Sequence, residues 1–299
     1  MADPRFRGSG VALVTPFDQG GVNEAALREL VRFQQREGTD ALIVCGSTGE
    51  AATMTPEEQR HALEIVVDEV AGAIPVVMGC GGSDTRSVAR LAGTAAEAGA
   101  DAVLVSAPPY NKPTQKGLIA HYRAVLDAQD KPVIVYNVPG RTSVNILPAT
   151  IAELAQDERV IGVKEACGDI SQVAELARLL DDQALIWSGN DDQTVPIMAL
   201  GGVGIISVLA NIAPRDTSRM AHLFLDGDVA GARALQLRYL PLIAALFVES
   251  NPIPVKTGVG MLGYDVGPLR LPLTPPSEAT RQKLAAAMKE AGLAVTAAA

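Results

Sequence analysis

Val160-Ile161-Gly162-Val163-Lys164-Glu165 is a short apolar stretch with a lysine near its end. Its length and its β-branched residues predict a buried strand. An ammonium group at the end of a buried strand is costly unless a carboxylate pairs with it or it loses its proton. A lysine of lowered pKa is a nucleophile that forms Schiff bases with carbonyl compounds. The stretch therefore predicts either a paired lysine or a reactive one.

Side chains alternate between the two faces of a strand, so Lys164 shares its face with Gly162 and Val160. Ile161, Val163 and Glu165 share the opposite face, which suits packing against helices. We expect Gly162 to leave space beside the lysine in a barrel interior. Glu165 is expected to point away from Lys164, which favours the reactive lysine. Pairing with a carboxylate from another strand remains the alternative.

Seven further runs of this kind are spread along the chain, and each is followed by a segment with the apolar period of a helix. The eight predicted strands cover residues 10–14, 41–45, 75–79, 102–106, 132–136, 160–164, 184–188 and 204–208. The predicted helices cover residues 23–37, 56–71, 84–98, 115–128, 148–156, 170–180, 192–200 and 214–226. Strands that are apolar on both faces and alternate with helices indicate a parallel sheet covered by helices.

Eight such units are the number that closes a barrel, so the sequence predicts an α/β fold, a (β/α)8 TIM barrel. The alternative is a doubly wound open sheet, which typically has a GxGxxG turn after its first strand. Thr15-Pro16-Phe17-Asp18 stands at that place and does not match.

The strand signal ends after Asp226, which predicts a barrel catalytic domain over residues 1–227 and a small C-terminal helical extension over 228–299. Helical segments are expected at 229–248, 255–262 and 277–291, with a break at Asn251-Pro252-Ile253-Pro254. The extension is expected to pack on the barrel or on a neighbouring subunit.

The composition excludes several classes of function. The 299 residues carry a net charge of −9 and no basic patch, so we expect neither nucleic acid nor a membrane surface as partner. No apolar run reaches the roughly 20 residues of a membrane span, and no secretory signal is seen at the start. We expect a soluble, cytoplasmic protein. The three cysteines and three histidines form no metal-binding motif, so no metal site is predicted.

The active site of such a barrel lies at the carboxyl ends of its strands. Tyr136 ends the strand before Lys164, and neighbouring strands lie about 4.8 Å apart, so its phenol is expected to reach the amine. The hydroxyls of Ser47, Thr48 and Tyr110 follow other strands and could relay protons. Arg141 suits a bidentate grip on a carboxylate. If these residues have no role in catalysis, Tyr136 would be a tyrosine at the edge of the core with its hydroxyl bonded to backbone. Arg141 would then be an ordinary surface arginine.

Five motifs occur in order along the chain: Gly46-Ser47-Thr48-Gly49-Glu50, Tyr136-Asn137-Val138-Pro139-Gly140-Arg141-Thr142, Gly162-Val163-Lys164-Glu165-Ala166, Ser188-Gly189-Asn190-Asp191-Asp192 and Asn251-Pro252-Ile253-Pro254-Val255-Lys256. Together they resemble the dihydrodipicolinate synthase (4-hydroxy-tetrahydrodipicolinate synthase) family. This family belongs to the pyruvate-dependent class I aldolases, the superfamily that also contains N-acetylneuraminate lyase. The resemblance runs from about residue 8 to residue 293.

The resemblance implies a lyase that condenses pyruvate with L-aspartate-4-semialdehyde to 4-hydroxy-tetrahydrodipicolinate, the first committed step of diaminopimelate and lysine biosynthesis. Pyruvate would form a Schiff base with Lys164, without a metal or an organic cofactor. Tyr136 would donate and accept protons, with Ser47 and Tyr110 completing a hydroxyl relay. Tyr110 would reach into the neighbouring subunit, which implies a homodimer that pairs into a homotetramer. The implied substrate-binding residues are Thr48, Arg141, Ile206 and Gly189.

Two departures from the family pattern matter. Ser47 stands where the synthase usually has threonine, and serine there is common in the lyase branches. An aldolase or lyase acting on N-acetylneuraminate or a 2-keto-3-deoxy sugar acid is therefore one alternative, and a non-catalytic ligand-binding barrel is a second. The family's lysine-inhibition site would fall on Pro56, Gln59, Ser83, Ser87 and Pro109, which lack the acid for the ligand's amino group. We therefore predict weak or absent inhibition by L-lysine.

Overall fold

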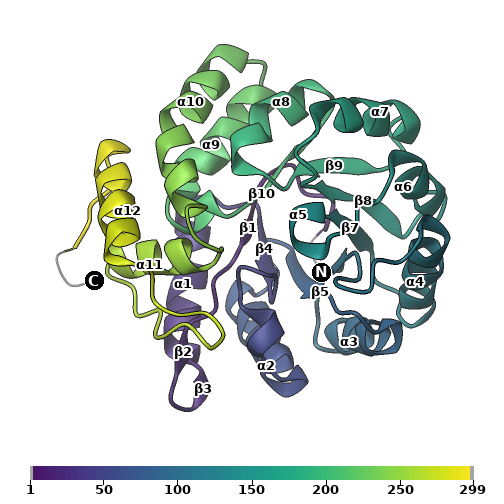
Figure 1. Ribbon diagram of the computed structural model, residues 1–299, viewed down its shortest axis with the longest axis horizontal. Coiled ribbons are helices and arrows are strands. Elements are labelled where there is room, and N and C mark those ends of the chain that lie inside the picture. Colours follow the sequence, from purple (N-terminus) through teal and green to yellow (C-terminus); the bar gives the residue numbers. More distant parts are fainter. Residues whose placement is uncertain (1–2, 297–299) are drawn as a thin grey trace.

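The computed structural model describes residues 3–296 and contains a closed barrel of eight parallel strands (Figure 1). These strands are β1 (Gly8–Ala12), β4 (Ala41–Val44), β5 (Val76–Cys80), β6 (Ala102–Ser106), β7 (Val133–Asn137), β8 (Val160–Glu165), β9 (Leu185–Ser188) and β10 (Gly204–Ser207). Each strand pairs with the next along the chain, and β10 pairs with β1 to close the barrel. The predicted (β/α)8 barrel is confirmed, and the open doubly wound sheet is wrong.

Helices surround the barrel at the predicted places. They are α1 (Glu24–Arg36), α2 (Pro56–Val70), α3 (Thr85–Glu97), α4 (Gln115–Asp127), α6 (Pro148–Leu154), α7 (Ile170–Leu180), α8 (Thr194–Ala199) and α9 (Pro214–Leu225). Local sequence explains the helix starts. Thr55 and Glu58 form a reciprocal capping box at α2, and Pro56 occupies its first turn. The side chains of Asn23, Asp84 and Asp169 cap α1, α3 and α7.

Several short elements escaped the sequence-based prediction. They are a hairpin of β2 (Phe17–Asp18) and β3 (Gly21–Val22), the helix α5 (Pro139–Thr142), and the 3₁₀ turns η1 (Ala51–Thr53), η2 (Asp191–Gln193) and η3 (Leu209–Asn211). None is long enough for apolar periodicity to reveal it. Most of them follow barrel strands, so they form part of the carboxyl rim.

The barrel interior is filled by an apolar cluster that includes Ile43, Leu104, Ile134, Trp187 and Ile206. The Trp187 ring stacks on Phe6 with centroids 5.0 Å apart, and its indole N–H donates to the Phe6 carbonyl. A Cβ at Gly162 would lie 2.5 Å from the Trp187 ring. The space at Gly162 is therefore taken by this tryptophan, and the prediction that it lies free beside Lys164 was wrong.

The strand β8 does not alternate throughout as predicted. Val133 pairs with Val160 but the next residue, Ile134, pairs with Gly162, so Ile161 is an extra residue in the ladder. Ile161 consequently packs in the barrel interior and Val160 in the outer core, which reverses the predicted faces of these two residues.

Beyond this bulge the expected alternation returns. Glu165 faces outward and accepts hydrogen bonds from Asn137 Nδ2 at 3.0 and 3.1 Å and from the Cys167 amide at 2.7 Å. The prediction that Glu165 points away from Lys164 is confirmed.

The C-terminal region contributes α10 (Val229–Leu246), α11 (Ile253–Met261) and α12 (Glu278–Glu290) (Figure 1). Leu242, Val255 and Leu284 belong to the same outer core as the barrel helices. Apolar packing is therefore continuous across residue 228, and the division into domains 1–227 and 228–299 remains a prediction. Within residues 3–296 no helix has both the length and the apolar character of a membrane span.

Candidate active site

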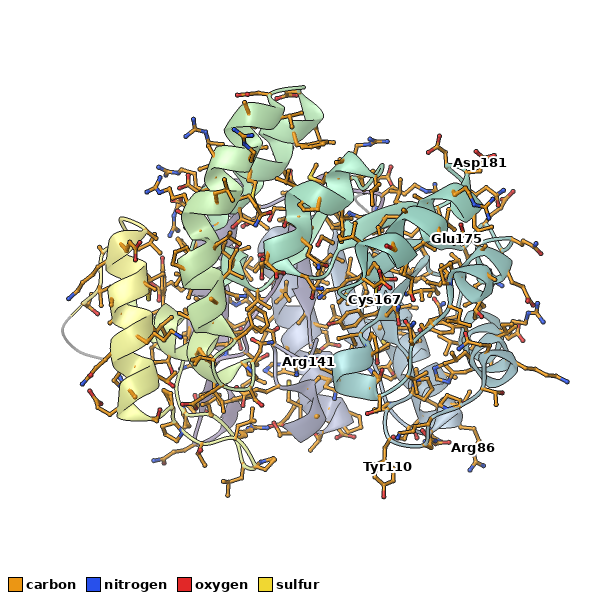
Figure 2. All side chains as sticks on the ribbon, turned by 45° about the horizontal axis from the view of Figure 1, so that its top comes forward. Arg86, Tyr110, Arg141, Cys167, Glu175 and Asp181 are labelled. Atoms are coloured by element: carbon orange, nitrogen blue, oxygen red, sulfur yellow. The ribbon has the colours of Figure 1, made fainter. Side chains whose placement is uncertain are left out.

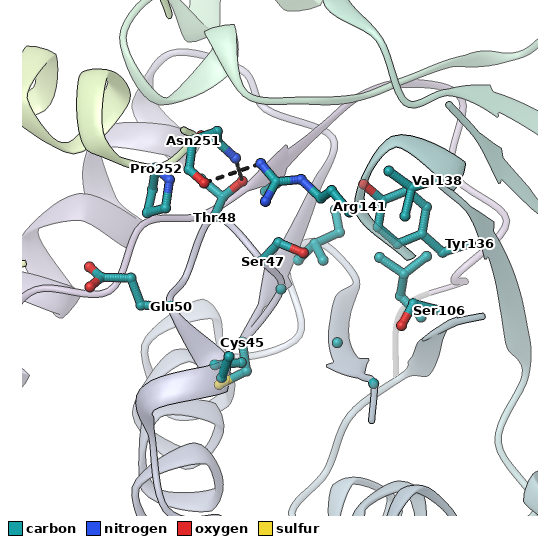
Figure 3. Close-up of a pocket in the computed structure, with 18 of the residues that line it drawn as sticks. Cys45, Ser47, Thr48, Glu50, Ser106, Tyr136, Val138, Arg141, Asn251 and Pro252 are labelled. Carbon is teal, nitrogen blue, oxygen red and sulfur yellow. Dashed lines mark hydrogen bonds between the residues drawn. The ribbon is translucent and has the colours of Figure 1, made fainter. Parts of the chain in front are cut away.

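A cavity of about 460 Å³ opens at the carboxyl rim of the barrel (Figure 3). Six of the eight residues predicted for the site line it. They are Ser47, Thr48, Tyr136, Arg141, Lys164 and Gly189. They lie at the ends of four different strands or just after them, so only closure of the barrel brings them together.

Lys164 lies in this cavity with only 4% of its surface exposed. Its Nζ is 4.4 Å from the centroid of the Tyr136 ring, and none of the ion pairs found within residues 3–296 includes it. Burial lowers the pKa of Lys164 to about 7, with the Arg141 charge adding to the shift and the Asp191 carboxylate opposing it. A large part of the amine is thus unprotonated near neutral pH and available as a nucleophile.

A second buried lysine shows what pairing looks like in the same molecule. Lys256 donates to Glu50 Oε1 at 2.7 Å, and both side chains are almost fully buried. Burial lowers the pKa of Lys256 too, but the Glu50 carboxylate opposes the shift directly. Lys256 is therefore a buried lysine whose charge is paired with a carboxylate. Lys164 lies in the environment of a reactive amine instead.

Tyr136 is the register partner of Lys164 on the neighbouring strand. Burial raises the pKa of Tyr136 to about 12, so its phenol keeps its proton at neutral pH. It lines the cavity together with Lys164. The tyrosine whose hydroxyl bonds a backbone carbonyl nearby is Tyr122, which donates to Val105. The position of Tyr136 suits a group that gives a proton to an intermediate on Lys164 and takes one back.

The loop after β4 is folded by backbone hydrogen bonds to the Gly46 carbonyl, from the Gly49 amide at 3.0 Å and the Ala51 amide at 3.4 Å. The two hydroxyls of this loop differ in their surroundings. Thr48 is buried, and its Oγ1 accepts a hydrogen bond from Asn251 Nδ2 at 2.9 Å (Figure 3). Ser47 is exposed and lines the cavity, so its hydroxyl is open to a reactant.

Arg141 reaches the cavity because α5 turns the chain inward directly after β7. Its Nη2 donates to the Asn251 carbonyl at 3.1 Å, which leaves other donors of the guanidinium free for an anion (Figure 3). Arg141 is exposed at the rim of this cavity, so its role in binding stays a prediction beside the alternative of a surface arginine.

Gly189 brings the loop after β9 close to the lysine. Its amide donates to the Glu165 carbonyl at 2.7 Å. A Cβ there would lie 2.7 Å from Ala166 Cβ and 3.1 Å from Lys164 Cγ, so a side chain would push the loop away from the site.

Two predicted site residues do not line the cavity. Tyr110 is 91% exposed and projects from the molecule, well apart from Arg141 (Figure 2). Ile206 is completely buried in the interior cluster, while Val208, two residues further on, lines the cavity. The inward direction of the Ile206 side chain places it within the packed barrel interior, so a substrate contact through this side chain is not seen.

Two residues with a clear place at the site were not predicted. Asn251 lines the cavity and bonds both Thr48 and Arg141. Asp191 does not line the cavity, but its charge raises the pKa of Lys164. Its buried carboxylate accepts hydrogen bonds from Ser207 Oγ and from the Val208 and Leu209 amides. Both stand in motifs quoted above, but nothing in the sequence distinguishes a residue that shapes a site from one that only packs.

The cysteines and the acids do not form a metal centre in the part of the chain that the structure describes, where no group of three or more His, Cys, Asp or Glu is placed to hold an ion. Cys45 and Cys80 line the cavity, and burial raises the pKa of Cys45 to about 12 and that of Cys80 further. Both are therefore thiols rather than thiolates near neutral pH.

Comparison with known proteins gives a consistent result. Residues 5–291 match the model of the dihydrodipicolinate synthetase family. The 4-hydroxy-tetrahydrodipicolinate synthase of Thermoanaerobacter sp. is 52% identical over 291 residues, which are 97% of this chain and 98% of that protein.

Solved structures agree with this relationship. The dihydrodipicolinate synthase of Thermotoga maritima superposes with a TM-score of 0.94 at 42% identity, covering 96% of this chain and 99% of the other. A monomeric dihydrodipicolinate synthase variant superposes with a TM-score of 0.95 at 41% identity, covering 98% and 100%. The chain therefore belongs to the dihydrodipicolinate synthetase family.

Proposed function

We propose that this chain condenses pyruvate with L-aspartate-4-semialdehyde to give 4-hydroxy-tetrahydrodipicolinate. The single observation that carries the proposal is Lys164, a buried amine with a pKa of about 7 in a cavity beside Tyr136. The relationship to proteins named 4-hydroxy-tetrahydrodipicolinate synthase supports the choice of substrates.

The proposed reaction begins with attack of the Lys164 amine on C2 of pyruvate, and loss of water leaves an imine. Removal of a proton from C3 gives an enamine, whose C3 then attacks the aldehyde carbon of the semialdehyde. The amino group of the adduct attacks C2 and expels Lys164, which closes the ring and restores the free enzyme. Lys164 itself supplies the electron sink as a protonated imine, so the proposed chemistry uses no metal or organic cofactor.

Tyr136 is proposed to carry protons to and from the carbinolamine, with Ser47 next in a hydroxyl relay. Thr48 and Gly189 would hold pyruvate, and Arg141 would bind the semialdehyde carboxylate. All five residues line the same cavity. Ile206 is proposed as a pyruvate contact through its backbone alone, since its side chain lies in the barrel interior.

Tyr110 is proposed to complete the relay of a neighbouring subunit in a homodimer, two of which form a homotetramer. Its 91% exposure and its positive φ of 73° support this role, because the ring is held away from its own barrel. A monomeric variant has the same fold, so the fold itself does not dictate the assembly.

Subunit hybrids test the shared tyrosine. Tyr110→Phe and Lys164→Ala variants are each expected to be nearly inactive, whereas a mixture that exchanges subunits regains activity. In a hybrid dimer one site combines an intact Lys164 with an intact Tyr110. A mixture that exchanges subunits and stays inactive would contradict the sharing, and sedimentation measures the assembly independently.

The substrate is tested by direct comparison. The purified protein is assayed with pyruvate and L-aspartate-4-semialdehyde, and in parallel for cleavage of N-acetylneuraminate and 2-keto-3-deoxy sugar acids. Turnover of the semialdehyde alone supports the proposal, whereas preferred turnover of a sugar acid would assign the chain to the alternative that Ser47 keeps open. Absence of any borohydride-trapped pyruvate adduct would favour a non-catalytic ligand-binding barrel.

We propose a cytoplasmic location on the composition alone.

A further inference from the structure

Glu50 and Lys256 stand in two of the five motifs, yet the proposed reaction uses neither. Lys256 Nζ lies 2.7 Å from Glu50 Oε1, with side-chain exposures of 2% and 0%. The other carboxylate oxygen accepts from the Arg270 amide at 3.0 Å, and Nζ also donates to the Pro268 carbonyl at 2.8 Å. Both charges are therefore well satisfied, and the pair joins the loop after β4 to the C-terminal region.

Several contacts join the loop to the C-terminal region. The Glu50–Lys256 pair and the hydrogen bond from Asn251 to Thr48 are two of them, and Arg270 also bonds Glu50 and Thr53. Lys256 is held relative to Asn251 because its amide donates to the Pro252 carbonyl in the first turn of α11. Contacts at separate points along the loop determine both its position and its orientation, whereas a single contact would leave a hinge.

The backbone of the loop also needs external support. Cys45 and Glu50, which flank residues 46–49, both have left-handed conformations with φ of 55° and 57°. Such conformations are unfavourable for residues other than glycine and persist where surrounding contacts hold them. The Glu50 carboxylate makes its contacts from one of these two positions.

The same attachment extends to the far side of the cavity. The Asn251 carbonyl accepts the hydrogen bond from Arg141, which follows β7, while the Asn251 amide group holds Thr48, which follows β4. One residue of the C-terminal region thus sets the distance between two proposed substrate contacts.

We propose that the Glu50–Lys256 ion pair is a positioning device for the reaction, which sets Ser47 and Thr48 relative to Lys164 and, through Asn251, the place of Arg141. The inference rests on the proposed function. It means that the C-terminal region helps to position residues of the active site. Stability alone gives little reason for a buried ion pair, since apolar replacements of similar volume are often as stable.

Three variants test this role. Glu50→Asp keeps the charges but shortens the side chain by one methylene, about 1.5 Å. Glu50→Gln combined with Lys256→Met removes both charges together, so neither is left buried alone. Glu58→Gln is the matched control, because Glu58 forms an ion pair with Arg270 of the same C-terminal region at 2.6 Å but does not line the cavity.

Each variant is assayed for kcat and for KM of both substrates, per active site titrated by borohydride trapping with pyruvate, and its melting temperature is measured. We expect kcat/KM for the semialdehyde to fall roughly 10- to 100-fold in Glu50→Asp and in the double variant, as a misplacement of about 1 Å predicts. The control keeps the parental constants, even where its melting temperature falls.

Parental kcat and KM per titrated site in Glu50→Asp would overturn the proposal, whatever the melting temperatures are. If the double variant does not fold, Glu50→Asp decides alone. If the parent traps pyruvate but does not turn over the semialdehyde, the proposed function fails, and the pair is then judged on pyruvate. The measurement is then the pyruvate concentration that gives half-maximal trapping. If Glu50→Asp leaves this concentration unchanged, the positioning role is overturned. If Glu50→Asp raises it, the positioning role is supported.

Discussion

Tyr136 and Lys164 are register partners on β7 and β8, and the lysine Nζ lies 4.4 Å from the centre of the tyrosine ring. The ring removes water from the amine without supplying a counter-ion. This arrangement explains how a lysine at the end of a buried strand is tolerated, because burial lowers the pKa of the amine to about 7 and no paired carboxylate is needed. It also places a proton donor beside the atom that forms the imine.

Lys164→Ala is expected to abolish the covalent adduct with pyruvate, because within residues 3–296 no other amine combines burial, a lowered pKa and a place in the cavity without a paired carboxylate. The measurement is the mass of the intact protein after borohydride reduction. The control is Lys283→Ala, which changes an exposed lysine and should keep the adduct. An adduct of unchanged yield in Lys164→Ala would contradict the assignment.

The rate of imine formation is expected to rise with pH through about 7 and to level off above it. The sign follows from the chemistry, since only the unprotonated amine attacks and its fraction grows as the pH passes the pKa of Lys164. Stopped-flow mixing with pyruvate across the pH range measures the midpoint. A midpoint near that of an ordinary lysine would show that Lys164 is not desolvated.

Asp191→Asn is expected to move this midpoint to lower pH. The Asp191 charge raises the pKa of Lys164 by favouring the ammonium form, so its removal lets burial lower the pKa further. Asp192→Asn is the matched control, because Asp192 is exposed and adjacent in sequence. A shift to higher pH in Asp191→Asn, or equal shifts in both variants, would contradict the coupling.

Tyr136→Phe is expected to lower kcat by roughly 10²- to 10⁴-fold, the usual range for a general acid–base group. The phenyl ring keeps Lys164 desolvated, so the pyruvate adduct still forms, more slowly. Tyr122→Phe is the control. It removes a buried hydroxyl that donates to the Val105 carbonyl, and should cost about 0.5–1.5 kcal/mol of stability without changing kcat. Equal kinetic effects of both variants would argue against a proton-transfer role for Tyr136.

Arg141→Ala is expected to raise KM for the semialdehyde roughly 10- to 100-fold while pyruvate trapping stays close to parental, because a charge-assisted bond contributes about 1.5–3 kcal/mol. Arg86→Ala removes an arginine whose side chain is 90% exposed and should change neither quantity. If Arg141→Ala weakens only the binding of pyruvate, Arg141 contacts pyruvate and not the semialdehyde.

L-lysine is expected to inhibit weakly or not at all. Of the residues at the corresponding places, Gln59 and Pro109 line the cavity, and Ser87 Oγ is engaged with Asp84 at 2.6 Å. Asp84 itself caps α3 through the Ser87 amide, so its carboxylate is already used. Steady-state rates at rising L-lysine test this directly, and near-complete inhibition at sub-millimolar concentration would refute it.

The sequence by itself determined the barrel. Eight apolar runs alternating with helical segments leave few other ways to bury strands that are apolar on both faces. The five motifs place Lys164 and Tyr136 at the ends of two of these strands and Arg141 just after one. Patterns within short stretches of sequence were enough to predict the barrel. The number of strands, the helix caps and the parallel direction of the strands all follow from residues close together in the chain.

Only the tertiary structure decided which groups meet. The bulge at Ile161 reverses two side chains that strict alternation had placed, and Trp187 occupies the space at Gly162. Pairing between Glu50 and Lys256, 206 residues apart, distinguishes the structural lysine from the reactive one. Such contacts depend on the closure of the barrel and on side-chain volumes across it, and no pattern along the chain records them.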